Sequence, residues 1–246
     1  MRVRAFLERA SAVDAPVLIQ GETGTGKTLL ARHIHRDGPR AEAAFVAVNC
    51  AGIPDGLFES ELFGHAKGAF TGAHRDRTGL IGAAAGGTLF LDEIGDLPRS
   101  HQAKLLSAVE DRSVRPVGSS ESVPINFRLI SATCRSLAEE RAAGRFRDDL
   151  FHRIALLKVT LPPLRERADD ILPLARRFLD AAVRRHGLSP LLFDTDARKE
   201  LVEHRWPGNV RQLSHVVEAA AILSPGSAVS GGLLSTLLDD EAAPLS

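Results

Sequence analysis

The chain has 246 residues, a length that suits one large domain or one domain with a small appendage. Lys plus Arg and Asp plus Glu balance at 31 each, so no overall charge draws the chain toward nucleic acid or a membrane surface. Two scattered cysteines, Cys50 and Cys134, make neither a disulfide framework nor a metal-ligand cluster. No signal peptide and no stretch near the ~20 apolar residues of a membrane span is evident, so we expect a cytoplasmic protein without a membrane partner.

Short apolar runs alternate with helical patterns over the first two-thirds of the chain. The runs predict buried strands at 17–19, 45–48, 89–91, 128–133 and 156–160. Apolar residues at helical spacing predict helices at 27–35, 57–63 and 102–110. Because strands alternate with helices, we predict an α/β fold with a doubly wound parallel sheet.

Pro162 and Pro163 interrupt this alternation, and the remainder of the chain has a helical pattern. The predicted helices lie at about 169–186, 194–204, 209–223 and, more weakly, 232–238. We therefore expect an α/β domain at 1–163 and a small helical lid with a loosely held tail at 164–246.

The segment after the first strand has the pattern of a phosphate-binding loop. Its residues are Gly21, Glu22, Thr23, Gly24, Thr25, Gly26, Lys27 and Thr28. Glycines let backbone N–H groups approach phosphates, and the helix starting near Lys27 adds its positive dipole end. Lys27 would bridge the outer phosphates, and the Thr28 hydroxyl would ligate Mg²⁺. The loop therefore predicts ATP and Mg²⁺ as cofactors.

Two carboxylates, Asp92 and Glu93, close the strand at 89–91. Ligands of open α/β sheets bind at the carboxyl ends of the strands, where both side chains emerge. Asp92 would hold the metal, and Glu93 would polarise the attacking water. The alternative is an acidic pair that caps a helix, which the upstream phosphate loop disfavours.

Between these motifs lies the hexapeptide Gly68, Ala69, Phe70, Thr71, Gly72 and Ala73. Its glycines and alanines make a slim loop in which Phe70 and Thr71 supply the sizeable contacts. An exposed Phe is unfavourable in water, so we expect this tip to bind a partner; the alternative is a Phe buried within the loop.

The order and spacing of the motifs resemble the central AAA+ domain of bacterial sigma-54-dependent transcriptional activators. The resemblance runs from about Val13 to Leu223 and includes the hexapeptide. Its other segments are Gly21–Thr28, Val48–Cys50, Glu59–His65, Gly86–Ile94, Phe146–Arg147, Leu161–Arg167 and Trp206–Arg211.

This resemblance implies an AAA+ P-loop NTPase that hydrolyses Mg-ATP as a ring, expected to be a homo-hexamer. The hexapeptide loop would engage sigma-54 RNA polymerase holoenzyme in the closed complex, and hydrolysis would drive opening. Promoter DNA would be contacted only indirectly by this segment. A second loop between Arg115 and Asn126 occupies the place of the family's supporting loop.

Catalytic roles also follow from the resemblance. Asn49 corresponds to a switch asparagine that holds Glu93 out of position until the nucleotide state changes. Arg147 and Arg153 correspond to arginine fingers that reach a neighbouring subunit's ATP. Arg211 corresponds to the second sensor, by which the helical lid contacts the phosphates.

Three departures from the family pattern stand out. Cys134 replaces the usual sensor Asn, and because a thiol is a poor hydrogen-bond donor, phosphate sensing passes to Thr133 or weakens. Ala66 replaces a common acidic residue before the hexapeptide. Neither a regulatory segment nor a helix-turn-helix is found, which leaves open an excised domain or a protein without its own DNA anchor. Two other functions also stay open: AAA+ remodelling of another target, and nucleotide-dependent assembly with little turnover.

Overall fold

A computed structural model describes residues 2–242 of the chain. The contacts divide the chain into two compact units, of which the first comprises Met1–Gly21 and Lys27–Leu161. The second unit comprises Glu22–Gly26 and Pro162–Ser246. Five residues of the phosphate loop therefore group with the helical part of the chain, although the sequence connects them to the sheet on both sides.

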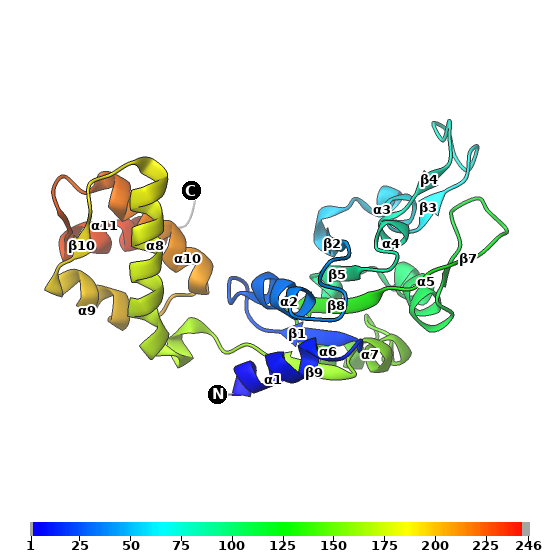
Figure 1. The fold of residues 1–246 in the computed structure, drawn as a ribbon, viewed down its shortest axis with the longest axis horizontal. Coiled ribbons are helices and arrows are strands. Elements are labelled where there is room, and N and C mark those ends of the chain that lie inside the picture. Colours follow the sequence, from blue (N-terminus) through cyan, green and yellow to red (C-terminus); the bar gives the residue numbers. More distant parts are fainter. Residues whose placement is uncertain (1, 243–246) are drawn as a thin grey trace. The chain divides into compact units, whose positions relative to one another are not determined.

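The first unit is built on a parallel sheet of five strands in the order β2-β5-β8-β1-β9 (Figure 1). The strands are β1 (Val17–Gln20), β2 (Phe45–Asn49), β5 (Thr88–Asp92), β8 (Arg128–Thr133) and β9 (Leu157–Thr160). Every pairing among them is parallel, which confirms the predicted sheet. β1 lies between β8 and β9, so the strand order reverses there; ligands bind beside such a reversal, at the carboxyl ends of the strands.

Helices cover both faces of this sheet because the strands are apolar on both faces. Leu18, Leu89 and Leu129 face one side, in a core completed by α3 (Asp55–Phe63), α5 (Arg99–Glu110), α6 (Leu137–Ala142) and α7 (Asp148–Ile154). Ile19 and Phe90 face the other side and pack with α1 (Arg2–Ser11) and α2 (Lys27–Arg36). The sheet is thus doubly wound, as predicted.

The first unit also contains short strands and helical turns that the sequence did not predict. Two antiparallel pairs form, one from β3 (Gly64–His65) and β4 (Arg77–Thr78), the other from β6 (Ser113–Val114) and β7 (Val123–Pro124). The helical turns α4 (Leu80–Ala83), η1 (Cys50–Gly52) and η2 (Ile94–Asp96) complete the unit. The first pair flanks the hexapeptide, and the second pair encloses residues 115–122 of the second loop.

The second unit is helical. It contains η3 (Leu164–Glu166), η4 (Ala168–Asp170), α8 (Ile171–His186), α9 (Thr195–Glu203), α10 (Asn209–Leu223), α11 (Gly231–Ala242) and the parallel pair β10 (Leu192–Phe193) and β11 (Ala228–Val229). Its core surrounds Trp206, which is fully buried and donates a 2.8 Å hydrogen bond from Nε1 to Leu201 O. Within residues 2–242, no helix has the length and apolar character needed to cross a membrane.

Candidate functional site

The buried side chain of Lys27 marks the end of the phosphate loop. α2 begins at this residue, and the Lys27 side chain is only 6% exposed. Lys27 Nζ donates a 3.0 Å hydrogen bond to Gly21 O, directly after β1. Gly21 N in turn donates to Thr133 O of β8 at 3.3 Å, so the start of the loop is joined to the centre of the sheet.

Thr28 and Asp92 meet at the carboxyl ends of the strands. The Thr28 hydroxyl donates to Asp92 Oδ2 at 3.1 Å, and Asp92 Oδ1 accepts from Glu93 N, also at 3.1 Å. A hydroxyl and a carboxylate side by side are hard oxygen ligands of the type that Mg²⁺ selects. The residues present therefore fit a magnesium ion that would also bind nucleotide phosphates.

Glu93 has an unusual backbone conformation, with φ 51° and ψ 48°. A non-glycine residue in this left-handed region is strained, and such residues cluster at functional sites. The turn aims the carboxylate back at the phosphate loop: Oε1 lies 3.6 Å from Lys27 Nζ, and Oε2 accepts from Cys134 N at 2.9 Å. One carboxylate therefore contacts the loop lysine and the strand end that carries the predicted sensor.

Asn49 lies opposite Asp92 in the register of β2 and β5. Its Oδ1 accepts from Ala51 N at 3.0 Å and caps η1. Among the described hydrogen bonds none joins Asn49 to Glu93, which is held by Lys27 and Cys134. The switch role of Asn49 therefore stays a prediction for another nucleotide state.

Thr133 ends β8 and is fully buried. Its hydroxyl accepts from Arg135 N at 3.0 Å. A Cβ atom added at Gly95 would lie 2.7 Å from Thr133 Oγ1, so the turn that follows Glu93 packs tightly against this strand end. An ion pair between Arg135 and Asp96 also joins the turn after β5 to the residues after β8. The sequence did not predict the roles of Gly95, Asp96 and Arg135, because their packing and ion pair join two strand ends that are far apart in the sequence.

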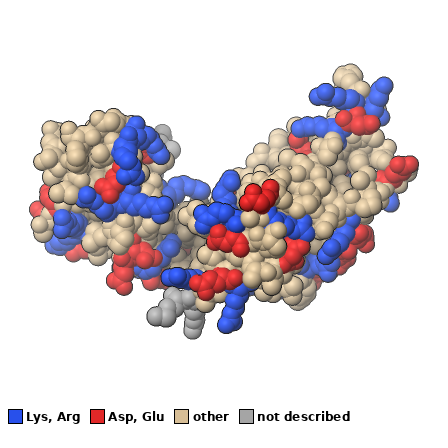
Figure 2. Space-filling view, viewed as in Figure 1, with Lys and Arg blue, Asp and Glu red and all other residues tan. Residues whose placement is uncertain are grey.

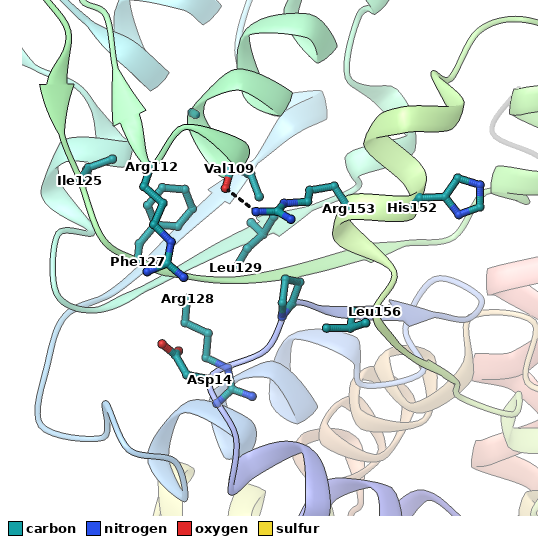
Figure 3. A pocket seen from close by; sticks show the side chains of 12 residues that line it. Asp14, Val109, Arg112, Ile125, Phe127, Arg128, Leu129, His152, Arg153 and Leu156 are labelled. Atoms are coloured by element: carbon teal, nitrogen blue, oxygen red, sulfur yellow. Dashed lines mark hydrogen bonds between the residues drawn. The ribbon is translucent and has the colours of Figure 1, made fainter.

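The two arginine-finger candidates lie at opposite ends of α7. The Arg147 guanidinium forms two hydrogen bonds to Asp149, and the Arg147 amide N donates to Gln102 Oε1 at 2.8 Å. Arg153 donates from Nη2 to Val109 O at 3.4 Å, in a cavity of about 280 Å³ that Arg112 and Arg128 also line (Figure 3). The structure therefore gives the two candidates different surroundings and does not bring them together.

The remaining loop residues, Glu22, Thr23, Gly24, Thr25 and Gly26, belong to the second unit. Gly24 has φ +79°, and its carbonyl accepts from the backbone N–H groups of Val210 (3.0 Å) and Arg211 (3.3 Å) at the start of α10. Arg211, the second-sensor candidate, is thus placed at the loop by its own main chain. Glu22 forms an ion pair with Arg165.

The hexapeptide joins β3 to β4 and projects beyond them (Figure 1). Gly68 N donates to Ala73 O at 2.8 Å, which closes the base of the loop. The Phe70 side chain is 42% exposed and meets the His65 ring edge-on, with 4.9 Å between ring centroids. Thr71 is exposed at the tip.

The second loop, between Arg115 and Asn126, packs against the hexapeptide and the residues that lead into it from β3, which we call the stem. Val117 N donates to Gly64 O and Ala66 N to Val117 O, both at 2.9 Å, and a Cβ at Gly118 would lie 2.6 Å from Ala69 Cβ. Lys and Arg side chains gather on this projection (Figure 2), and Lys67, Arg75 and Arg77 are exposed there. Phe70 and Thr71 are therefore presented on a stem that both loops build.

The first unit combines a doubly wound parallel sheet with a phosphate loop after its first strand and carboxylates at the end of β5, and the second unit is helical. These features define a P-loop NTPase of the AAA+ class. The model of the Sigma-54 interaction domain family matches residues 1–160, and that of the AAA+ ATPase lid domain matches residues 165–244. The chain belongs to the Sigma-54 interaction domain family.

The chain is also similar to transcriptional regulatory proteins and response regulators. The chain is 48% identical over 239 residues to the transcriptional regulatory protein GlrR of Escherichia coli K12, covering 96% of this chain and 54% of the relative. It is 50% identical over 221 residues to the response regulator protein PilR of Pseudomonas aeruginosa, covering 90% and 50%. The chain therefore spans about half the length of the curated relatives it matches.

A solved structure agrees over the whole chain. The crystal structure of NtrX from Brucella abortus in complex with ATP superposes with a TM-score of 0.90 at 36% identity. That match covers 100% of this chain and 54% of NtrX.

Proposed function

We propose that this chain is a Mg-dependent ATPase that converts the closed promoter complex of sigma-54 RNA polymerase to the open complex. Membership of the Sigma-54 interaction domain family and the similarity to ATP-bound NtrX support this proposal. The observation that carries it is the exposed Phe70–Thr71 tip, because nucleotide sites occur in many P-loop proteins whereas this tip specifies the target.

The nucleotide half of the proposal rests on the cluster at the carboxyl ends of β1, β5 and β8. Backbone N–H groups of the glycine-rich loop would cradle the phosphates, and Thr28 and Asp92 would hold Mg²⁺, whose charge supports phosphoryl transfer. Lys27 would exchange the Glu93 carboxylate for phosphate oxygens. That exchange frees Glu93 Oε1 to accept a proton from the attacking water while Oε2 stays on Cys134 N.

Hydrolysis would be completed across a subunit boundary in a homo-oligomeric ring, which we take to be a hexamer. A guanidinium supplied in trans would stabilise charge in the transition state. We take Arg147 as the stronger of the two finger candidates because it lies in the Phe146–Arg147 segment that resembles the family motif. Its bidentate pairing with Asp149 shows that the side chain favours a planar pair of oxygens, the arrangement that a phosphate also offers.

The proposal is tested by sigma-54 binding in the presence of ADP–aluminium fluoride, a transition-state nucleotide analogue. We expect a stable complex on a native gel that Thr71→Ala abolishes. Thr78→Ala removes an exposed hydroxyl outside the hexapeptide on the same hairpin, so this matched control should bind normally. Complex formation by Thr71→Ala at the wild-type level would show that the hexapeptide tip is not the sigma-54 contact, and no complex with wild-type protein would favour another remodelling target.

A parallel ATPase assay separates hydrolysis from assembly. Glu93→Gln should lower turnover by about 10²-fold or more, because the amide cannot accept the proton of the attacking water. Wild-type protein whose phosphate release equals that of Glu93→Gln would instead indicate a nucleotide-dependent assembly module with little turnover.

A further inference from the structure

Glu22 places a carboxylate inside the loop that is proposed to receive phosphates. Like charges repel, so an unpaired Glu22 would weaken phosphate binding. The structure pairs it with Arg165 in a bidentate ion pair, with Oε1 to Nη2 at 2.6 Å and Oε2 to Nη1 at 2.8 Å. Arg165 and Asn209 hold the pKa of Glu22 at about 2, so its charge persists and the arginine neutralises it.

Asn209 is the second partner of Glu22 and is fully buried. Its Nδ2 donates to Glu22 Oε2 at 3.1 Å and to Thr23 O at 3.0 Å, while its Oδ1 accepts from Leu164 N at 2.7 Å. The donors and the acceptor of this amide thus meet groups of matching type. The residue has φ +53°, a left-handed conformation that Asn tolerates better than most side chains.

The next two loop residues are also held by the second unit. Gly24 O accepts from two N–H groups at the start of α10, and Thr25 O accepts from Arg167 Nη2 at 3.0 Å. A Cβ at Gly24 would lie 2.2 Å from Gly208 O, so the loop and the turn before α10 are in close contact. Each residue from Glu22 to Thr25 therefore has a partner in residues 164–167 or 208–211.

We infer that Glu22, Arg165 and Asn209 are positioning residues that hold the phosphate loop in its binding conformation, and that Glu22 does not itself bind nucleotide. This inference rests on the proposed nucleotide binding and changes the expected role of Glu22. Arg165 supplies the charge that cancels the carboxylate, and Asn209 ties that carboxylate to the main chain of the loop. We name these three residues the loop anchor.

The first test measures affinity for a fluorescent ATP analogue in Glu22→Gln, Arg165→Gln and the double variant. In Arg165→Gln the Glu22 carboxylate is left uncompensated in the loop, so we expect the dissociation constant to rise by about 10-fold. In Glu22→Gln the loop loses the ion pair but gains no negative charge, so we expect a smaller rise. The double variant should lose no more than the worse single variant, because both charges are then absent. The KM for ATP should rise with the dissociation constant, whereas kcat at saturating ATP stays within about 2-fold of wild type.

Arg176→Ala provides the matched control. Arg176 forms an exposed ion pair with Asp180 on α8, with 3.1 Å between Nε and Oδ1, and no loop residue takes part in that pair. Its removal should leave nucleotide affinity unchanged. Additive losses in the double variant, or wild-type affinity in Arg165→Gln, would overturn the loop anchor.

The second test needs no nucleotide. Amide hydrogen exchange of residues 22–26 in the free protein should accelerate in Arg165→Gln and Asn209→Ala but not in Arg176→Ala. Unchanged exchange in both anchor variants would overturn the inference. Faster exchange combined with no ATP binding by the wild-type protein would sustain the loop anchor and count against the proposed function alone.

Discussion

Arg147 and Asp149 form a bidentate ion pair within one chain, with Nε to Oδ1 at 3.0 Å and Nη2 to Oδ2 at 2.7 Å. This pairing holds the pKa of the Asp149 carboxyl at about 2 and raises the pKa of the Arg147 guanidinium. The arginine expected to serve a neighbouring subunit is thus occupied by its own chain in the structure of a single subunit. A neighbour's nucleotide would have to displace Asp149.

Replacement of Arg147 should separate hydrolysis from binding. Arg147→Ala is expected to lower ATP turnover by on the order of 10²-fold or more, because the charge supplied across the subunit boundary is lost. The dissociation constant for ATP should change by less than about 3-fold, because the residue lies outside the phosphate loop of its own chain. Steady-state phosphate release and fluorescent-nucleotide titration measure the two quantities. A collapse of affinity would show that Arg147 acts in cis.

Gly118 tests whether the second loop supports the hexapeptide. It has φ +78°, and a Cβ there would lie 2.6 Å from Ala69 Cβ. Gly118→Ala should displace the hexapeptide and weaken sigma-54 binding while ATPase activity persists. The backbone strain should also destabilise the fold by about 1 kcal/mol or more.

Gly144→Ala is the control for that substitution. Gly144 has a similar φ of +70°, but open space surrounds the position of its Cβ. It should lose comparable stability in a urea titration and retain sigma-54 binding. If Gly118→Ala and Gly144→Ala bound sigma-54 equally well, the second loop would not support the hexapeptide through Gly118.

Much of the fold follows from periodicity. A buried parallel strand is apolar on both faces, so runs such as Leu89-Phe90-Leu91 identify the sheet directly. The pairs β3–β4 and β10–β11 were not predicted, because strands of two residues leave no period to read. α1 was also not predicted, although its apolar residues Val3, Phe6, Leu7 and Ala10 recur at helical spacing and share one core cluster.

The site residues also fall into those that the sequence predicts and those that it does not. Lys27, Thr28, Asp92 and Glu93 carry their chemistry in side chains with a fixed motif spacing, and the structure places them together. The hydrogen bond from Cys134 N to the Glu93 carboxylate has no signature in the sequence, because every non-proline residue has an N–H group. The loop anchor was not predicted because Glu22 pairs with side chains that lie 143 and 187 positions away in the sequence.

His35 should make stability depend on pH. It is 8% exposed, its Nδ1 lies 3.0 Å from Thr88 Oγ1, and burial lowers its pKa from the ordinary value of 6.5. The unfolded chain therefore binds this proton more readily than the folded protein. The stability from neutral His35 is present above pH 6.5 and declines as pH falls from there through the lowered pKa of the folded state.

Melting temperatures of wild-type protein and His35→Gln at pH 7.5, 6.5 and 5.5 measure this dependence. Glutamine can retain a hydrogen bond to Thr88 but does not titrate, so its melting temperature should fall less between pH 6.5 and pH 5.5. If the melting temperatures of the two proteins fell equally with pH, His35 would not be the source of the pH dependence.

The central claim is that ATP hydrolysis acts on sigma-54 RNA polymerase through the Phe70–Thr71 tip. The most direct measurement is ATP-dependent open-complex formation with sigma-54 holoenzyme on a partly melted promoter, at a protein concentration high enough to make DNA tethering unnecessary. The account predicts open complexes with wild-type protein and none with Thr71→Ala, whose ATPase activity stays within about 3-fold of wild type because the tip lies outside the nucleotide cluster. Robust ATP hydrolysis by wild-type protein without promoter opening, or equal opening by Thr71→Ala, would contradict it.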